Sequence, residues 1–499
     1  MAKDFRSLTP RIQSVDWRQS GVRFTEGRIG REGAQVSSTQ NQPMLIDDAI
    51  DRIGFGRFQK RLLGVCGVTW AADAAEVFLI AFALPGFKEE FALSSGEAGL
   101  VVSSTFLGMF IGAWFWGTLS DRIGRRTGFQ ITIAIFAIFG LASAFAPSVW
   151  WLAFLRMMTG FGLGGALPLD FSLFAEYLPR KNRGRWLVLL ESFWGVGTLV
   201  AAGLAWILVP TVGWRYLLAT SAVAALFVLW VRMRVPESPR WLMTQGREPE
   251  ARAILNQVAR ENGVAPIDEP LAPPPPAPKV GPGDLLRPRL RRITITNWTA
   301  WFLLSFSYYG IFVWLPTVLK EEYGFISSYA WVFFLVAVQM PGYFSAAWLV
   351  EKWGRKPTLT LYLGASGVFT FLWAMVNSVE LVFVTAALMS FFSLGAFATL
   401  YTYTPETYPT TLRTTGMGSA SGWARVGGFI APFVGGLLFD ASLVLALSVF
   451  ALAFLLNAGV VAVFAQETKD RDLADTLTSP EEERRAAQAT PRRPQAVGS

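Results

Sequence analysis

The stretch Gly117-Thr-Leu-Ser-Asp-Arg-Ile-Gly-Arg-Arg126 recurs 230 residues later as Ala347-Trp-Leu-Val-Glu-Lys-Trp-Gly-Arg-Lys356, and this repeat is the strongest indication of the fold. A second element, Glu176-Tyr-Leu-Pro179 followed by Arg183, recurs at the same offset as Glu406-Thr-Tyr-Pro409 followed by Arg413. All four pieces lie where a long apolar run meets a cluster of positive charge. The repeat therefore predicts a duplicated half-molecule, and it favours a two-halved membrane transporter over a soluble solenoid.

The composition agrees with a membrane protein and excludes several other classes. Hydrophobic residues make up 52% of the chain and charged residues 16%, against about 25% charged in a typical soluble domain. The net charge of +8 does not predict nucleic-acid binding, because Lys and Arg gather in short segments between apolar runs. The chain has no histidine and a single cysteine, Cys66. We expect no disulfide framework, no His-based site, and neither a metal nor a cofactor.

Twelve apolar segments have the length of about 20 residues that a helix needs to cross a bilayer core. We therefore predict an all-helical membrane protein with two pseudo-symmetric six-helix bundles. The predicted spans are 62–86, 97–119, 128–146, 149–175, 186–209, 214–232, 293–318, 328–350, 358–376, 379–403, 416–438 and 441–465.

The charges of the connecting loops predict the orientation in the membrane. Alternate loops carry several Lys and Arg residues, whereas the loops between them carry few. Cytoplasmic loops are the ones enriched in positive charge, so both termini are expected in the cytoplasm and the protein in the cell (inner) membrane. The positively charged loops hold Arg122, Arg125, Arg126, Arg180, Lys181, Arg183, Arg185, Lys352, Arg355, Lys356 and Arg413.

Outside the two bundles the sequence predicts a polar linker and two tails. The linker contains a short amphipathic helix near 249–262 and a stiff, proline-rich stretch at 272–278. We interpret it as a hinge without a ligand. The first 43 residues lack apolar periodicity and a signal-peptide core, and we hypothesise that Met44 is the native start. The predicted organisation is a disordered tail at 1–43, bundles at 44–232 and 293–465, the linker at 233–292, and a disordered tail at 466–499.

Ionisable residues within the predicted spans are functional candidates, since each costs roughly 2.5–3.5 kcal/mol to insert. Asp73 and Glu76 lie three residues apart on span one, so both carboxylates share one helix face. Arg156 and Asp170 on span four are separated by 14 residues, close to four turns. We predict that these four residues and Glu191 on span five carry proton coupling, with Arg156 as the exchange partner. The alternative is a permanently ionised packing cluster around Arg156.

Taken together, these motifs resemble the major facilitator superfamily near its sugar porters. The broader resemblance rests on the repeated Gly117–Arg126 element, the Arg-x-x-x-Gly-x-Gly-x-Gly-Gly pattern that begins at Arg156, and Pro236-Glu-Ser-Pro-Arg240. A narrower resemblance, to the synaptic-vesicle-glycoprotein-like branch that includes bacterial niacin transporters, rests on shorter motifs. Those motifs are Gly54-Phe-Gly-Arg-Phe-Gln59, Trp70-x-x-Asp73-x-x-Glu76, Leu167-Pro-Leu-Asp170 and Leu190-Glu-Ser-Phe-Trp194.

The resemblance implies alternating access, in which the two bundles rock about a central site. It also implies that the repeated charged elements form cytoplasmic gating locks. In this chain Ala347 replaces the usual glycine and Glu351 the usual aspartate, so we expect the second lock to be looser. The residues implied in gating are Asp121, Arg125, Glu176, Arg183, Glu351, Arg355, Glu406 and Arg413.

The second half offers aromatic side chains and one arginine for the substrate. Trp301, Tyr308 and Tyr309 lie on span seven, Tyr401 on span ten and Arg425 on span eleven. Aromatic walls beside a guanidinium suit a flat organic anion, whose carboxylate the arginine would bind. Ordinary core and lipid-facing packing is the alternative for each single aromatic residue.

We therefore predict a non-enzymatic, proton-coupled symporter of a small organic acid, with nicotinate or a similar aromatic monocarboxylate as the best guess. Its partners would be this substrate, protons and the lipid bilayer, with no nucleic acid, and the protein would be a monomer. A sugar or polyol symporter, an exporter of the same fold and a non-transporting sensor remain alternatives. An enzyme is disfavoured because no Walker A pattern, nucleophile elbow or metal-ligand cluster occurs.

Overall fold

The computed structural model describes residues 43–469 apart from 182, 233–234, 273–281, 322, 324–327 and 410–411. Most of the predicted tails and of the proline-rich stretch lies outside the described residues. The first half comprises α2 (Arg57–Glu90), α3 (Ser95–Ile123), α4 (Arg125–Ser143), α5 (Val149–Glu176), α6 (Arg183–Glu191), α7 (Phe193–Val212) and α8 (Trp214–Arg232). The second comprises α11 (Pro288–Phe312), α12 (Leu315–Glu321), α13 (Ser328–Trp353), α14 (Arg355–Met375), α15 (Val379–Glu406), α16 (Arg413–Ala441) and α17 (Leu443–Phe464).

The predicted all-helical membrane fold is confirmed. Eleven helical segments among the described residues are long and apolar enough to cross a bilayer. Two of these segments are interrupted: α6 and α7 meet at Ser192, and α11 and α12 meet at residues 313–314. Helix α8 occupies the remaining predicted span, at Trp214–Arg232. Each of the twelve predicted spans therefore coincides with a helix or a pair of consecutive helices.

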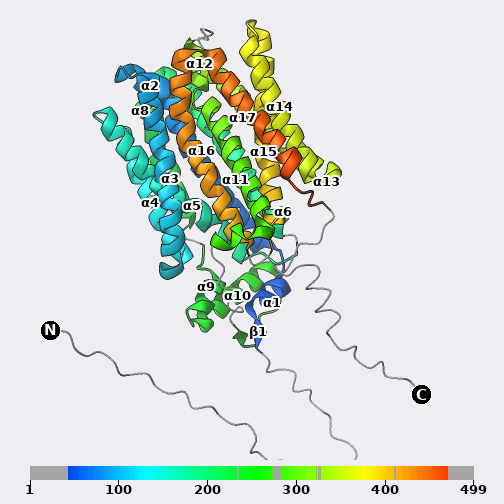
Figure 1. Ribbon diagram of the computed structural model, residues 1–499. Helices are drawn as coiled ribbons and strands as arrows, with labels where there is room; N and C mark the ends of the chain where they lie inside the picture. Colours follow the sequence, from blue (N-terminus) through cyan, green and yellow to red (C-terminus); the bar gives the residue numbers. More distant parts are fainter. Residues whose placement is uncertain are drawn as a thin grey trace, which may run out of the picture. The chain divides into compact units, whose positions relative to one another are not determined.

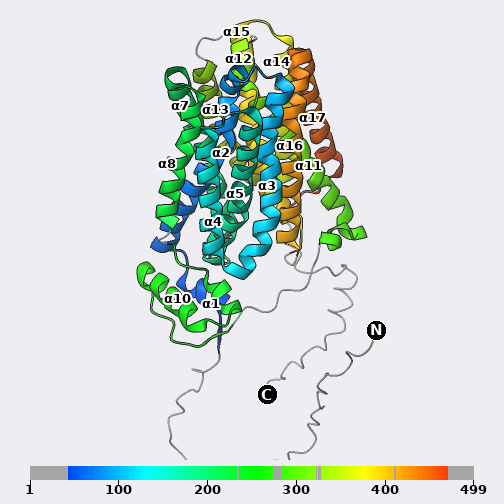
Figure 2. The same cartoon turned by 90° about the vertical axis from the view of Figure 1, so that its left-hand side faces the viewer.

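The long helices run roughly side by side along one direction (Figures 1 and 2). The two halves pack against each other mainly through α16 on α3 and α13 on α7. Glycines allow close approach within the first half: a Cβ on Gly108 would lie 1.9 Å from the Met157 carbonyl oxygen of α5. Such small-residue contacts are the usual way in which membrane helices pack tightly.

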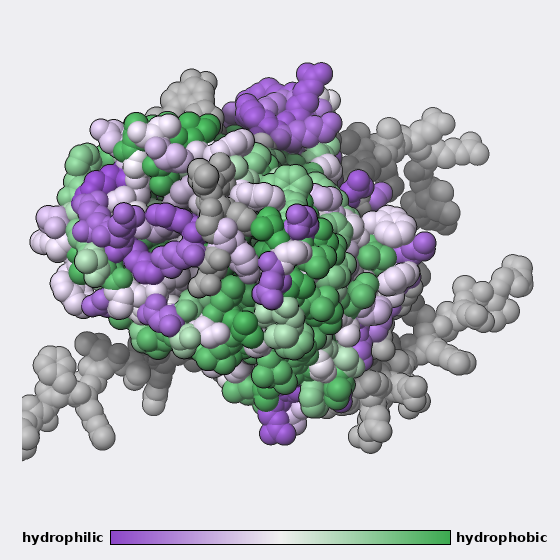
Figure 3. All heavy atoms as spheres, turned by 90° about the horizontal axis from the view of Figure 1, so that it is seen from above, coloured by the Kyte–Doolittle hydropathy of each residue, from purple (hydrophilic) through white to green (hydrophobic). Residues whose placement is uncertain are grey.

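Large apolar side chains cover the sides of the bundle. Trp114, Trp150 and Phe145 are 82%, 75% and 74% exposed, and Val223 is 70% exposed. Exposed aromatic and aliphatic surface of this extent suits contact with lipid rather than with water. Seen from the end that carries α12, hydrophilic residues form separate patches beside hydrophobic surface (Figure 3).

A small layer of short elements packs at the opposite end of the bundle, which we call the linker end (Figures 1 and 2). Strand β1 (Met44–Leu45) pairs in parallel with β2 (Leu271–Ala272). Three short helices belong to the same layer: α1 (Ile46–Ile53), α9 (Pro239–Thr244) and α10 (Glu248–Asn262). The 3₁₀ turn η2 (Pro282–Leu286) packs against α11 and α16 of the second half.

Ion pairs hold these short elements together and attach them to the first half. Asp47 of α1 is 2.8 Å from Arg240 of α9, and Asp48 of α1 is 3.2 Å from Arg180, which follows α5. The apolar face of α10 buries Leu255 and Val258 in the same core as Ile50 of α1. The start of the described chain and helices α9 and α10 of the linker are thus folded onto the first half.

Candidate functional site

A cavity of about 50 Å³ lies between the two halves. This volume is several times the 10–15 Å³ that a single water requires, so the cavity suits a small ligand. The first half contributes side chains from α2, α3, α6 and α7, and the second half from α11, α13, α15 and α16. The residues that line it are Trp70, Phe106, Glu191, Trp194, Gly195, Trp301, Ser305, Tyr308, Tyr309, Tyr343, Leu394, Phe397, Ala398, Tyr401, Ser421, Ala424 and Arg425.

The five residues predicted to bind substrate all line this cavity. The ring of Trp301 meets that of Tyr401 edge-on, with centroids 4.7 Å apart. The Trp301 indole donates a hydrogen bond to Thr404 at 2.9 Å, and the Tyr308 hydroxyl donates one to Gln339 at 3.2 Å. These bonds occupy the polar ends of Trp301 and Tyr308, so their ring faces remain available to form apolar walls.

Arg425 is the cation of this cavity and is only partly buried. Within the described part of the chain it makes no hydrogen bond or ion pair. Its guanidinium interacts electrostatically with Tyr401, Tyr309 and Asp73. An arginine that faces a cavity without a bound partner can accept an anionic group of a ligand.

The aromatic residues that the first half contributes to the cavity were not predicted. The rings of Trp70 and Trp194 are tilted at 49° with centroids 5.0 Å apart, and the ring of Phe106 meets that of Tyr309 edge-on at 4.6 Å. Trp70 lies one turn before Asp73, and Trp194 lies three residues after Glu191, so helical spacing from the predicted acids could have found both. The aromatic wall therefore belongs to both halves, with three of its nine aromatic residues from the first half and six from the second.

A buried ion pair lies within the first half. The Arg156 guanidinium is 2.7 Å from the Glu76 carboxylate, and these side chains are 0% and 2% exposed. Arg156 also donates to the backbone carbonyl of Glu76 at 3.2 Å. Asp73 and Asp170 are buried as well, at 3% and 0% exposure. The structure therefore pairs Arg156 with Glu76, while Asp73 interacts electrostatically with Arg425 of the other half.

Glu191 does not join the Arg156 pair. It lies at the end of α6 and lines the central cavity with Arg425. Its side chain is enclosed and interacts with Tyr401 and Trp70. The structure thus places this predicted proton-coupling residue among the predicted substrate-binding residues.

The predicted gating elements lie at the linker end. In the first half, Arg125 is 3.7 Å from Glu176, and Arg183 donates a hydrogen bond to the Leu178 carbonyl at 2.8 Å. The side chain of Asp121 lies outside the described residues.

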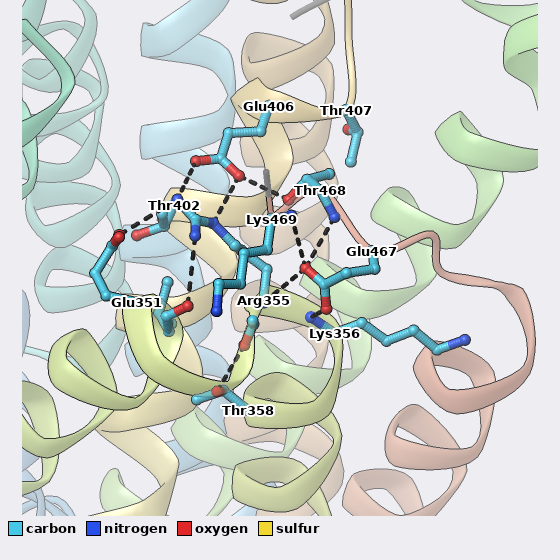
Figure 4. A network of polar contacts seen from close by, with 12 residues as sticks. Glu351, Arg355, Lys356, Thr358, Thr402, Glu406, Thr407, Glu467, Thr468 and Lys469 are labelled. Atoms are coloured by element: carbon cyan, nitrogen blue, oxygen red, sulfur yellow. Dashed lines mark hydrogen bonds and ion pairs between the residues drawn. The ribbon is translucent and has the colours of Figure 1, made fainter. Parts of the chain in front are cut away.

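The corresponding elements of the second half form a network of charged and polar side chains (Figure 4). Arg355 donates two hydrogen bonds to Glu406, both of 2.9 Å, and is 3.3 Å from Glu351. Arg413 donates to the Pro405 carbonyl at 3.0 Å. Glutamate at 351 is one methylene longer than aspartate and reaches Arg355 one helical turn away. The expectation of a looser second lock stays a prediction, because the Asp121 side chain of the first lock lies outside the described residues.

Two further glutamates extend the 230-residue repeat. Glu237 accepts hydrogen bonds from the backbone N–H of Arg126 at 3.1 and 3.2 Å. Glu467, 230 residues later, accepts hydrogen bonds from the backbone N–H groups of Arg355 and Lys356 at 2.9 and 3.1 Å (Figure 4). Each carboxylate thus caps the N-terminus of a helix, α4 or α14, where negative charge is stabilising. Comparison of 236–238 with 466–468 at the known offset could have found this pair.

The glycines of the repeated element explain how the caps fit. Gly124 and Gly354 have φ angles of +96° and +107°. A Cβ at either position would lie 2.6 Å from an oxygen of the capping glutamate. Glycine at these two positions therefore satisfies both the backbone conformation and the space requirement.

At the end of the bundle opposite the linker, ion pairs join the two halves. Lys88 of α2 is 3.2 Å from Glu321 of α12, and Lys320 of α12 is 3.4 Å from Glu89 of α2. The Tyr329 hydroxyl also donates to the Phe82 carbonyl across the halves at 3.0 Å. The first two contacts are charge-swapped: each half offers a lysine followed by a glutamate.

Comparisons with known proteins agree with this architecture. The family described as "Sugar (and other) transporter" matches residues 64–477. The niacin transporter NiaP of Acinetobacter baylyi is 40% identical over 85% of this chain and 98% of its own length. The synaptic vesicle 2-related protein of Xenopus laevis is 33% identical over 89% of this chain and 84% of its own. A partially occluded, inward-open structure of the xylose transporter XylE from E. coli superimposes with a TM-score of 0.68 at 18% identity, covering 82% of this chain and 100% of that one.

Proposed function

Because this chain belongs to the sugar (and other) transporter family of the major facilitator superfamily, we propose that it carries an aromatic monocarboxylate of the nicotinate type across the cell membrane, with protons as the coupling ion. The protein is a multi-pass membrane transporter and not an enzyme. The observation that carries the substrate proposal is Arg425, whose guanidinium has no hydrogen bond or ion pair within the described residues and faces an aromatic cavity. The 40% identity with a niacin transporter supports the same class.

The cavity favours an aromatic anion over a sugar. Sugar recognition uses several side-chain amides and carboxylates that exchange hydrogen bonds with hydroxyl groups, whereas the described lining contains neither Asn nor Gln. The ring faces of Trp301 and Tyr401 offer stacking surfaces, and Arg425 offers the charge. The likeness to xylose symporters lies at 18–20% identity and concerns the fold.

The proposed proton coupling uses the position of Asp73 between the cavity and the buried ion pair. Arg425 interacts electrostatically with Asp73, which lies one helical turn from Glu76 and its partner Arg156. A substrate carboxylate bound to Arg425 would compete with Asp73 for the same positive charge. Loss of that interaction favours protonation of Asp73, since a buried carboxylate without a cation is costly. Substrate and proton would then bind together.

Alternating access requires that the two ends of the bundle close in turn. We assign the closing contacts of one end to the charge-swapped pairs of α2 and α12, which must separate before the halves can part there. At the linker end, the clusters around Arg125 and Arg355 each lie within one half, and we propose that they hold in place the helix ends that meet when this end closes.

The test is uptake of radiolabelled nicotinate by purified protein in proteoliposomes, with and without an imposed pH gradient. We expect gradient-driven uptake that is competed by nicotinate and not by xylose. Arg425→Gln should lose substrate binding, whereas Asp73→Asn should keep binding and lose stimulation by the gradient. Unchanged nicotinate affinity in Arg425→Gln would remove the substrate proposal, and intact gradient-driven uptake in Asp73→Asn would remove the coupling proposal. Vesicles of both orientations would separate import from export.

A further inference from the structure

The central cavity holds two opposite charges that do not pair with each other. Glu191 is 6% exposed, and its Oε2 atom has no hydrogen-bond partner among the described residues. Arg425 lines the same cavity without a hydrogen bond or an ion pair in the described chain. Charged groups withdrawn from water usually pair, because an unpaired buried charge costs free energy. This arrangement leaves two recognition points open in one site.

Aromatic side chains lie around and between the two charges. Trp70 and Tyr401 lie beside the Glu191 carboxylate. Tyr309 and Tyr401 each interact electrostatically with both Glu191 and Arg425. The two polar ends of the cavity are therefore connected by ring surfaces, and a flat ligand can lie along these surfaces with one polar group at each end.

We infer that Glu191 and Arg425 form a two-ended site that selects amphoteric aromatic acids, with the ligand carboxylate at Arg425 and a basic nitrogen at Glu191. This inference rests on the proposed function and specifies its substrate class. A single proton, carried by the ligand nitrogen or by the Glu191 carboxyl, joins the two groups in one hydrogen bond. Pyridine carboxylates and aminobenzoates have both groups, whereas benzoate has only the carboxylate.

Glu191 thereby acts as a specificity-determining residue of the binding site. A ligand without the nitrogen contacts the same aromatic walls but leaves the Glu191 carboxyl buried without a basic partner. Sites built around a polar contact reject analogues that lack the matching group by large factors. We expect wild-type protein to bind nicotinate at least about tenfold more tightly than benzoate, which has the same ring size and the same carboxylate.

The experiment measures the dissociation constants of nicotinate and benzoate for full-length protein in lipid nanodiscs, by competition against radiolabelled nicotinate and radiolabelled benzoate. The variants are Glu191→Leu, which removes the polar contact at similar size, and Glu191→Gln, which removes the charge and keeps the shape. Glu380→Gln is the matched control, since Glu380 is an exposed acid at the start of α15 and lies outside the cavity.

The expected result is that Glu191→Leu brings the ratio of the two dissociation constants close to one, chiefly by weakening nicotinate, while benzoate still binds. Retained benzoate binding shows that this variant is folded. Should Glu191→Leu fail to fold, Glu191→Met, which also lacks a polar donor or acceptor of similar strength, takes its place. The inference is overturned if wild type does not prefer nicotinate, or if a folded Glu191→Leu or Glu191→Met protein keeps the full preference.

These outcomes are separate from failure of the proposed function. If wild type binds both acids equally and Arg425→Gln abolishes both, the monocarboxylate proposal stands and the role of Glu191 falls. If wild type binds neither acid, the proposed function itself falls.

Discussion

The two ends of the transporter are held by ion pairs of different kinds. At the linker end the pairs Arg125–Glu176 and Arg355–Glu406 each lie within one half, and the same pattern occurs in both halves. At the other end Lys88–Glu321 and Lys320–Glu89 connect the halves. A contact within one half can persist while the halves move as rigid bodies, whereas a contact between them must break. We therefore expect the first kind to stabilise a bundle and the second kind to influence which end is closed.

The two kinds also differ in burial. The side chains of Arg355 and Glu406 are 13% and 23% exposed, whereas those of Lys320 and Glu89 are 55% and 79% exposed. Partly buried, bidentate pairs contribute more to stability than exposed pairs, which water screens and which contribute about 0–1 kcal/mol. Contacts that must break in every transport cycle are expected to contribute little free energy. The exposure of the Lys320–Glu89 pair between the halves agrees with this expectation.

The largest effect is expected for Arg355→Ala. It removes both hydrogen bonds to Glu406 and leaves this carboxylate without its guanidinium, which we expect to cost about 2–3 kcal/mol of folding stability. The measurement is the thermal unfolding midpoint of purified protein. Arg125→Ala is the matched control in the first half, where the pair is 3.7 Å apart, and its midpoint should fall less. Equal losses would contradict the inequality of the two locks.

A smaller loss is expected for Gly354→Ala. The φ of +107° is strained for alanine, and the new methyl group would lie 2.6 Å from the Glu467 carboxylate. We expect about 1–2 kcal/mol of destabilisation, again measured by thermal unfolding. Gly364→Ala in the same helix is the control, because its Cβ would meet only Ala458 at 3.9 Å. A Gly364→Ala protein no more stable than Gly354→Ala would exclude this explanation.

Acid should remove the contribution of the helix cap at Glu467. Burial alone would raise the pKa of this carboxyl, but the backbone N–H groups of Lys469, Arg355, Lys356 and Thr468 together hold it below 4.5. Because the folded-state pKa is lowered, the stabilisation is present above pH 4.5 and disappears as the pH falls through the lowered value.

We therefore expect wild type to exceed Glu467→Gln by about 1 kcal/mol at neutral pH. The difference in unfolding midpoint should stay constant down to about pH 5 and shrink below pH 4.5. Thermal unfolding of both proteins from pH 7 to pH 3.5 measures it. A difference that grew on acidification would have the wrong sign for a carboxylate cap.

The smallest effect on stability, and the most specific effect on transport, is expected for the pairs between the halves. Lys88→Glu places like charges opposite each other at the Glu321 contact, which costs up to about 1 kcal/mol for an exposed pair. The unfolding midpoint should change little, while the distance between spin labels on α2 and α12 should shift toward an open end.

The double variant Lys88→Glu/Glu321→Lys restores the attraction and should return both the label distances and the uptake rate toward wild type. High salt should reduce the difference between the single variant and wild type, because exposed charges are screened. A double variant no better than the single one would show that this contact does not control opening.

Much of the fold follows from local features of the sequence. Membrane helices satisfy their own backbone hydrogen bonds, so apolar length alone locates them: the sixth span was predicted at 214–232 and α8 covers the same residues. The short elements of the linker end were harder to predict, because β1 and β2 pair residues 44–45 with 271–272, more than 200 positions apart. No pattern of neighbouring residues in the sequence predicts such a contact.

The candidate site could be predicted only in part from the sequence. The aromatic residues of the second half and Arg425 were chosen by residue type and helical spacing, and all five line the cavity. Glu191 was grouped with Asp73 and Glu76 because all are acids within spans, and sequence gives no means of telling which helix faces meet. The side of the bundle that each acid faces depends on how α6 packs, which is a property of the assembled halves.

By itself, the sequence determined the duplication, the number of spans and the helix-end elements, since each depends on chain periodicity, apolar length or residues close along the chain. The tertiary structure decided which charges meet. It paired Arg156 with Glu76, set Asp73 near Arg425, and placed Glu191 and Arg425 in one cavity without an ion pair among the described residues. The reason is physical: a charge inside a membrane protein is defined by its partners, and here those partners come from different helices and from both halves.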